Sequence, residues 1–165
     1  MSAPTTTPPF SIFFREQAPA VARLLAVLVP TGEVEELVQE TFIAALTAYD
    51  RFDGRSPRSW ALAIARRKAI DAHRARARRP PPAPAVEDGL PDVAPAPAGR
   101  DGDAGIWADV AKLPPKQRAA LFMRYALDMP HREIGEVLGC SEAAARRNVH
   151  EGISKLRSRL QEVRR

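Results

Sequence analysis

The sequence predicts an all-α protein made of two small helical domains that a flexible Pro/Ala-rich linker joins. Apolar residues recur at helical spacing from residue 10 to residue 79, and again from residue 106 to the end. The apolar set is dominated by Ala, Leu and Val, and aromatic residues make up only 6% of the chain, which favours helices over a β-sandwich. Seven prolines lie between Pro80 and Pro97, where the helical pattern stops.

The first domain is predicted to span residues 10–79, behind a disordered tail at residues 1–9. It divides into a three- or four-helix bundle, with apolar stripes that place Phe14 and Trp60 inside. Ser56 is expected to be the N-cap of the last helix and Pro57 its first residue. The main helices are expected at residues 10–29, 33–49 and 57–78.

Residues 80–105 form the predicted linker, because their Pro- and Ala-rich sequence has no apolar periodicity and cannot offset the entropy cost of ordering. A coil of this length spans roughly 30 Å, and an extended polyproline helix spans about 80 Å. The linker therefore allows the two domains to lie far apart if it is stretched.

The second domain is predicted to span residues 106–165 and to contain a helix-turn-helix at residues 130–150. Gly139 should form a left-handed helix cap, and Ser141 should begin the second helix of the motif. A buried stripe on that helix is expected to run as far as Leu160. The four helices of the domain are expected at residues 106–112, 115–127, 130–138 and 142–161.

Charge is segregated along the chain, although the formal net charge is only +5. Residues 33–53 contain six acidic residues and one basic residue, whereas residues 66–79 contain seven Lys or Arg and one Asp. Residues 146–165 contain seven further Lys or Arg. An acidic helix is suited to a basic protein partner, and basic helices are suited to phosphate, which makes nucleic acid a candidate ligand.

The composition excludes several classes of protein. Cys140 is the only cysteine, so an intrachain disulfide and a multi-cysteine metal site are ruled out, and no metal or other cofactor is expected. No apolar run is long enough to span a membrane, and residues 1–9 do not form a signal peptide, so a cytoplasmic location is expected. His73, His131 and His150 are scattered, and no glycine-rich phosphate loop is present, so we expect neither an enzyme nor a small-molecule substrate.

Five segments occur in the order typical of extracytoplasmic-function sigma factors, the smallest members of the sigma-70 superfamily. They are LVQETF (37–42), YDRFDGRSPRSW (49–60), AIARRKAIDAHR (63–74), LPPKQRAALFMRY (113–125) and the helix-turn-helix. The first domain thus resembles sigma region 2, and the second resembles sigma region 4. The resemblance implies a transcription-initiation factor that binds core RNA polymerase and promoter DNA.

Residue by residue, the resemblance implies three contact sets. The acidic helix would bind the clamp helices of the polymerase largest subunit through Glu36, Gln39, Glu40 and Phe42. The −10 element would contact a loop and the helix after it, through Phe52, Asp53, Gly54, Arg55, Ser56, Arg67, Asp71 and Arg74. The −35 element would contact the second domain through Arg124, Ser141, Ala143, Ala144, Arg146, Arg147 and His150.

The resemblance also implies a polymerase flap contact for the second domain and an anti-sigma factor as a further partner. One departure from the family pattern is Glu151, an acidic residue on the recognition helix that should repel phosphate. A second hypothesis is a helix-turn-helix repressor or activator whose first half senses a ligand or dimerises. A long Pro/Ala tether argues against that hypothesis, because a dimeric repressor needs a rigid connection to fix the spacing of its half-sites.

Overall fold

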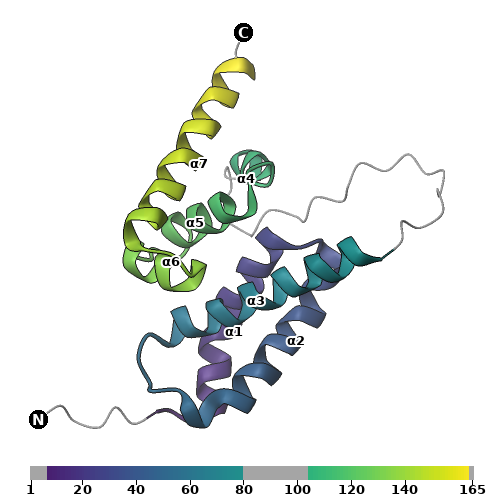
Figure 1. Cartoon of the computed structure of the whole chain (residues 1–165), viewed down its shortest axis with the longest axis vertical. Helices are drawn as coiled ribbons and strands as arrows, with labels where there is room; N and C mark the ends of the chain where they lie inside the picture. The colour runs from purple at the N-terminus through teal and green to yellow at the C-terminus, as the bar shows by residue number, and fades with distance from the viewer. Residues whose placement is uncertain (1–6, 80–103, 164–165) are drawn as a thin grey trace, which may run out of the picture.

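The computed structural model describes residues 7–79 and 104–163. The expected flexible linker, apart from its last two residues, and most of the expected disordered tail lie outside these ranges. The N-terminal module, residues 10–79, consists of three α-helices and one short 3-10 turn (Figure 1). These elements are α1 (Phe10–Leu28), α2 (Thr31–Ala48), η1 (Tyr49–Arg51) and α3 (Pro57–Arg78).

The core of the N-terminal module forms where the apolar stripes of α1, α2 and α3 meet. Val21, Leu24 and Leu25 on α1 are fully buried, and so is Leu62 on α3. α2 begins at Thr31, two residues earlier than the sequence predicted, directly after Pro30. Proline is suited to this position because it has no backbone N–H to donate. Phe14 faces outward, contrary to the prediction, and is 44% exposed.

The C-terminal module, residues 104–163, packs a long last helix across three shorter helices (Figure 1). Phe122, Met123, Ile134 and Leu138 fill its core. Leu160 is 43% exposed, so the predicted buried stripe of the last helix ends before this residue. The helices are α4 (Ala104–Val110), α5 (Pro115–Tyr125), α6 (His131–Leu138) and α7 (Glu142–Val163).

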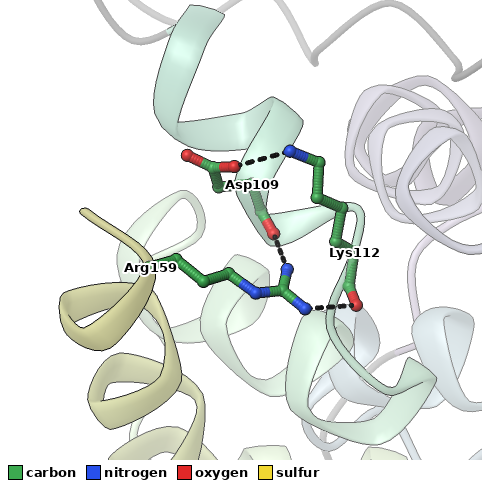
Figure 2. Close-up of polar contacts among 3 residues, drawn as sticks. All are labelled: Asp109, Lys112 and Arg159. Carbon is green, nitrogen blue, oxygen red and sulfur yellow. Dashed lines mark hydrogen bonds and ion pairs between the residues drawn. The ribbon is translucent and has the colours of Figure 1, made fainter. Parts of the chain in front are cut away.

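Arg159 connects the far end of α7 to the last turn of α4 and to the residues that follow it. Figure 2 shows its guanidinium donating to the carbonyl oxygens of Asp109 and Lys112, each at 3.5 Å. The Lys112 ammonium in turn lies 2.9 Å from the Asp109 carboxylate. Because the last carbonyls of a helix have no partner within the helix, a cation placed there stabilises the helix end.

The two modules contact each other, which the sequence patterns did not predict. α3 packs against α6, and α1 packs against α5, as Figure 1 shows for α3 and α6. Arg118 on α5 donates to the Val27 carbonyl at 3.0 Å, and Arg58 on α3 donates to the Leu127 carbonyl at 3.2 Å. The prediction of two modules held together only by a tether is therefore corrected: in this structure they also share an interface.

Candidate nucleic-acid interface

The turn of the helix-turn-helix is built as the sequence predicted. Gly139 ends α6 with a φ of +64°, in the left-handed region that glycine adopts without strain. The Ser141 hydroxyl accepts a hydrogen bond from the Ala144 backbone N–H at 3.1 Å, which caps the start of α7. A Cβ added to Gly135 would lie 2.8 Å from the Cys140 carbonyl oxygen, so α6 and the turn approach each other as closely as a glycine allows.

The first turns of α7 present two arginines and a histidine to solvent. Ala145 and Val149 are buried and fix this end of the helix against the core. Arg146, Arg147 and His150 are exposed on the opposite side. The remaining predicted residues of this set are Ser141 and Ala143, which are exposed, and Ala144 and Arg124, which are half-buried.

Two carboxylates lie within about one helical turn of these side chains along α7. The Arg146 guanidinium is 2.9 Å from the Glu142 carboxylate, one turn earlier. The Glu151 carboxylate accepts a hydrogen bond from the Gln117 amide on α5 at 2.9 Å. Glu151 thus contacts α5, while the side chains of Arg147 and His150 make no hydrogen bond or ion pair within residues 7–79 and 104–163.

The loop before α3 is shaped by a local hydrogen bond and by two residues with positive φ. The Asp53 carboxylate accepts a hydrogen bond from the Arg55 backbone N–H at 2.8 Å. Gly54 and Ser56 both have positive φ, of +78° and +45°. Ser56 stands at the N-cap position as expected, but its side chain makes no capping hydrogen bond. Asp53, Arg55 and Ser56 are exposed, and Gly54 is half-buried.

Phe52 requires a correction, because it is buried rather than available to DNA. It is only 7% exposed, and its ring stacks on Trp60 with centroids 4.5 Å apart. Phe13 and Tyr49 lie against the same ring, each with its centroid 5.9 Å away. Phe52 therefore anchors the loop in the aromatic core, and the exposed loop residues after it are the ones that a ligand can reach.

Phe42 requires the same correction on the acidic helix. It is 5% exposed, and the Phe14 ring packs edge-on against it at 4.6 Å. Glu36 and Gln39 are exposed as predicted. Glu40 is half-buried, and its carboxylate lies 3.7 Å from the Lys68 ammonium on α3. The acidic helix thus pairs in part with its basic neighbour, and an ion pair between Glu33 and Arg76 adds to this.

The outer face of α3 carries the predicted stripe. Arg67, Asp71 and Arg74 are all exposed at spacings of four and three residues. None of the three takes part in an ion pair among the described residues. This face can meet phosphate without breaking an internal contact.

Two exposed apolar surfaces were not predicted. Ile43 is 66% exposed and Leu46 is 57% exposed on α2. Both lie on the same side of α2 as Glu36, Gln39 and Glu40, at helical spacing. The sequence pattern could therefore have predicted this exposed apolar surface. In the C-terminal module a groove of about 400 Å³ lies between α4, α5 and α7, and its lining includes Trp107, Tyr125 and Leu160.

Other kinds of site find no support in the described residues. Residues 7–79 and 104–163 hold no group of three or more His, Cys, Asp or Glu side chains arranged to bind a metal ion. Within the same ranges, no helix is both long and apolar enough to cross a membrane.

The fold and its surfaces define a two-module helical protein with a helix-turn-helix and segregated acidic and basic faces. Residues 13–79 match the family model described as sigma-70 region 2, and residues 108–156 match that described as sigma-70 region 4. The chain is similar to the extracytoplasmic-function (ECF) RNA polymerase sigma factor ShbA of Streptomyces griseus, with 34% identity over 134 residues that cover 76% of this chain and 70% of ShbA. The chain belongs to the ECF sigma factor family.

Other relatives agree with this assignment. SigG of Mycobacterium tuberculosis is 32% identical over 80% of this chain, which spans 42% of SigG. SigF of Caulobacter vibrioides is 34% identical over 78% of this chain and 72% of SigF. Among solved structures, the sigma factor RpoE in complex with the anti-sigma factor NepR from Bartonella quintana has a similar fold, with a TM-score of 0.74, 20% identity, and coverage of 92% of this chain and 96% of RpoE. CnrH in complex with the cytosolic domain of CnrY has a TM-score of 0.66, 22% identity, and coverage of 93% and 88%.

Proposed function

We propose that this chain recruits core RNA polymerase to promoters in the cytoplasm and opens the duplex there, acting by binding rather than by catalysis. The observation that carries the proposal is the first part of α7, where Ala145 and Val149 are buried while Arg146, Arg147 and His150 are exposed. A helix anchored in this way can insert its outer face into the major groove, where each base pair has a distinct donor and acceptor pattern. The −35 element is the expected target.

The loop and α3 are suited to the −10 element. Opening DNA costs about 1.4 kcal/mol of stacking per base-pair step, which a protein without ATP chemistry must offset by binding the separated strand. Asp53, Arg55 and Ser56 are exposed beside Gly54, and Arg67, Asp71 and Arg74 continue along α3. Phe52 holds this loop in place from within the core and is not a contact in this proposal.

The outer stripe of α2 is suited to the polymerase clamp helices. Glu36, Gln39 and Glu40 supply polar and acidic groups, and exposed Ile43 and Leu46 add apolar area next to them. An interface with an apolar centre and a charged rim combines affinity with specificity. The groove of the C-terminal module is suited to the flap region of polymerase, or to an anti-sigma factor such as those bound in the solved relatives.

The proposal is tested by mixing the purified chain with core RNA polymerase and measuring run-off transcription from a native promoter. Co-purification with polymerase and promoter-dependent transcripts are the expected results. A stable homodimer that binds DNA without polymerase, and that gives no transcripts with it, would favour a conventional repressor or activator and contradict the proposal.

A further inference from the structure

A small cavity lies between the two modules, where α1 and α3 meet the start of α5. Its volume is about 190 Å³. Leu28 and Ile70 line it from the N-terminal module, and Ala119 lines it from α5. Pockets for drug-sized ligands usually exceed roughly 300 Å³, so this cavity is suited to a small group.

Four residues with nitrogen-bearing side chains are among those that line this cavity. Arg66, His73 and Arg74 come from α3, and Lys116 comes from α5. No acidic side chain lines the cavity. Asp71, the nearest acidic residue along α3, instead lines a different cavity, between α2 and α3.

The cations of this cavity also lack carboxylate partners elsewhere. Within residues 7–79 and 104–163, the ion pairs of α3 involve Lys68 and Arg76, and none involves Arg66, Arg74 or Lys116. Arg66 is half-buried, and this burial lowers the pKa of its guanidinium. Arg74 and Lys116 are exposed, so an anion can reach them from solvent and offset the repulsion among the like charges.

The start of α5 adds further donors at the same place. Pro114 stands at the N-cap position without a capping side chain, and Pro115 is the first helical residue. The backbone N–H groups of the next residues have no carbonyl partner within the helix, and they lie at the positive end of its dipole. Pro115 and Lys116 both line the cavity, so this helix end faces the same space as the α3 cations.

We propose that this cavity binds a phosphoryl oxyanion that bridges the N-terminal and C-terminal modules. The oxyanion would accept charge-assisted hydrogen bonds from Arg66 or Arg74 on one side and from Lys116 on the other. It is either free phosphate or a phosphomonoester, or else a phosphate of a nucleic-acid backbone. The proposal goes beyond promoter recognition, because Lys116 belongs to none of the contact sets described above.

The test measures binding of inorganic phosphate to the full-length chain by isothermal titration calorimetry, at fixed ionic strength with chloride as the reference anion. Lys116→Gln and Arg74→Gln each remove one cation, from opposite modules, at exposed positions where folding should be unaffected. Each should weaken phosphate binding roughly tenfold, the effect of losing one charge-assisted hydrogen bond. Lys155→Gln removes an exposed cation from α7 outside the cavity and should leave the affinity unchanged.

A short single-stranded oligonucleotide distinguishes the two sources of phosphate. If the oligonucleotide binds, inorganic phosphate does not, and Lys116→Gln weakens the oligonucleotide complex, the bound group is a backbone phosphate. The proposal is overturned if neither probe binds saturably, or if Lys116→Gln and Lys155→Gln have the same affinities. It is also overturned if only Arg74→Gln has an effect, because the site would then lie on α3 alone. Core polymerase takes no part in these measurements, so they succeed or fail independently of the proposed transcription function.

Discussion

Phe52 illustrates how a single aromatic side chain fixes a loop from inside the fold. Its ring stacks on Trp60 within a cluster that also includes Phe13 and Tyr49. We expect Phe52→Ala to lower the free energy of unfolding by about 3 kcal/mol, because it leaves a cavity in this cluster. Chemical denaturation followed by circular dichroism measures this change.

Phe14→Ala is the matched control for that prediction, since Phe14 is also a phenylalanine of the N-terminal module but is 44% exposed. Phe14→Ala should lower the free energy of unfolding by less than half as much as Phe52→Ala, because the Phe14 side chain buries less apolar area. Equal losses for the two variants would mean that Phe52 is not held in the core as described.

Arg146 is the residue on which −35 recognition is expected to depend most. Its guanidinium is exposed at the start of α7, and among the described residues it pairs with Glu142 alone, one turn away. Arg146→Ala should weaken use of the upstream element by about 1–3 kcal/mol, the range for a lost base contact. Run-off transcription from a promoter with and without its −35 element measures the effect.

Lys155→Ala removes a cation from the same helix at a position further from its start. It should reduce transcription only slightly, and equally on both promoters, because a distant cation contributes to non-specific attraction alone. If Arg146→Ala leaves transcription from the complete promoter unchanged, α7 does not read the upstream element through this side chain.

At the scale of elements, the angle between α6 and α7 depends on the absence of a side chain at Gly135. Its added Cβ would meet the Cys140 carbonyl oxygen at 2.8 Å, and a backbone atom cannot move aside cheaply. Gly135→Ala should therefore destabilise the chain by about 1–3 kcal/mol and weaken −35 binding as well. Thermal unfolding and a duplex-binding assay measure the two effects.

Gly32→Ala provides the contrasting substitution. Gly32 lies in the first turn of α2, and no atom lies within 4 Å of its added Cβ. Alanine should stabilise this helix by up to about 1 kcal/mol, since it loses less backbone entropy than glycine on folding. A destabilised Gly32→Ala together with a neutral Gly135→Ala would contradict the packing described here.

The acidic stripe of α2 is expected to act as one element in polymerase binding. Glu40→Arg reverses a charge at its centre and should abolish co-purification with core polymerase. The fold should survive, because the contact with Lys68 is a partly exposed ion pair worth less than about 1 kcal/mol. Glu162→Arg makes the same charge change on an exposed residue of α7 and should leave polymerase binding intact.

Helix positions were predictable from the sequence because caps and apolar spacing are local signals. Gly139 and Ser141 define the turn where expected, and α3 begins at Pro57. The burial of Phe42 and Phe52 was not predicted, because a family motif does not distinguish an aromatic residue that supports a surface from one that forms it. Their burial depends on rings brought together from α1, α2 and α3, which no local pattern encodes.

At the scale of the whole molecule, the contact between modules was beyond sequence reasoning, because it joins residues separated by the linker. Arg118 is central to it, since its guanidinium donates to the Val27 carbonyl and burial lowers its pKa. The Nε atoms of Arg23 and Arg118 are buried without a hydrogen-bond partner among the described residues. The hydrogen bonds of the charged side chains at this interface are therefore incomplete in this structure.

Arg118→Ala should shift the chain toward separated modules roughly tenfold, because it removes a hydrogen bond from a charged donor. Small-angle X-ray scattering should show a larger radius of gyration, and the apparent affinity for core polymerase should rise. Lys155→Ala removes an exposed cation of α7 that lies outside the groove of the C-terminal module, and it should change neither measurement. An unchanged radius for Arg118→Ala would show that this contact does not hold the modules together.

Promoter elements two duplex turns apart lie about 70 Å from each other. If the two modules bind these elements as proposed, the α1–α5 and α3–α6 contacts have to break on every promoter. The free energy needed to separate the modules is then the same for every promoter complex. A change at the interface would raise or lower initiation at all target genes by one common factor. The relative preference for different promoters would still be determined by the residues that contact DNA.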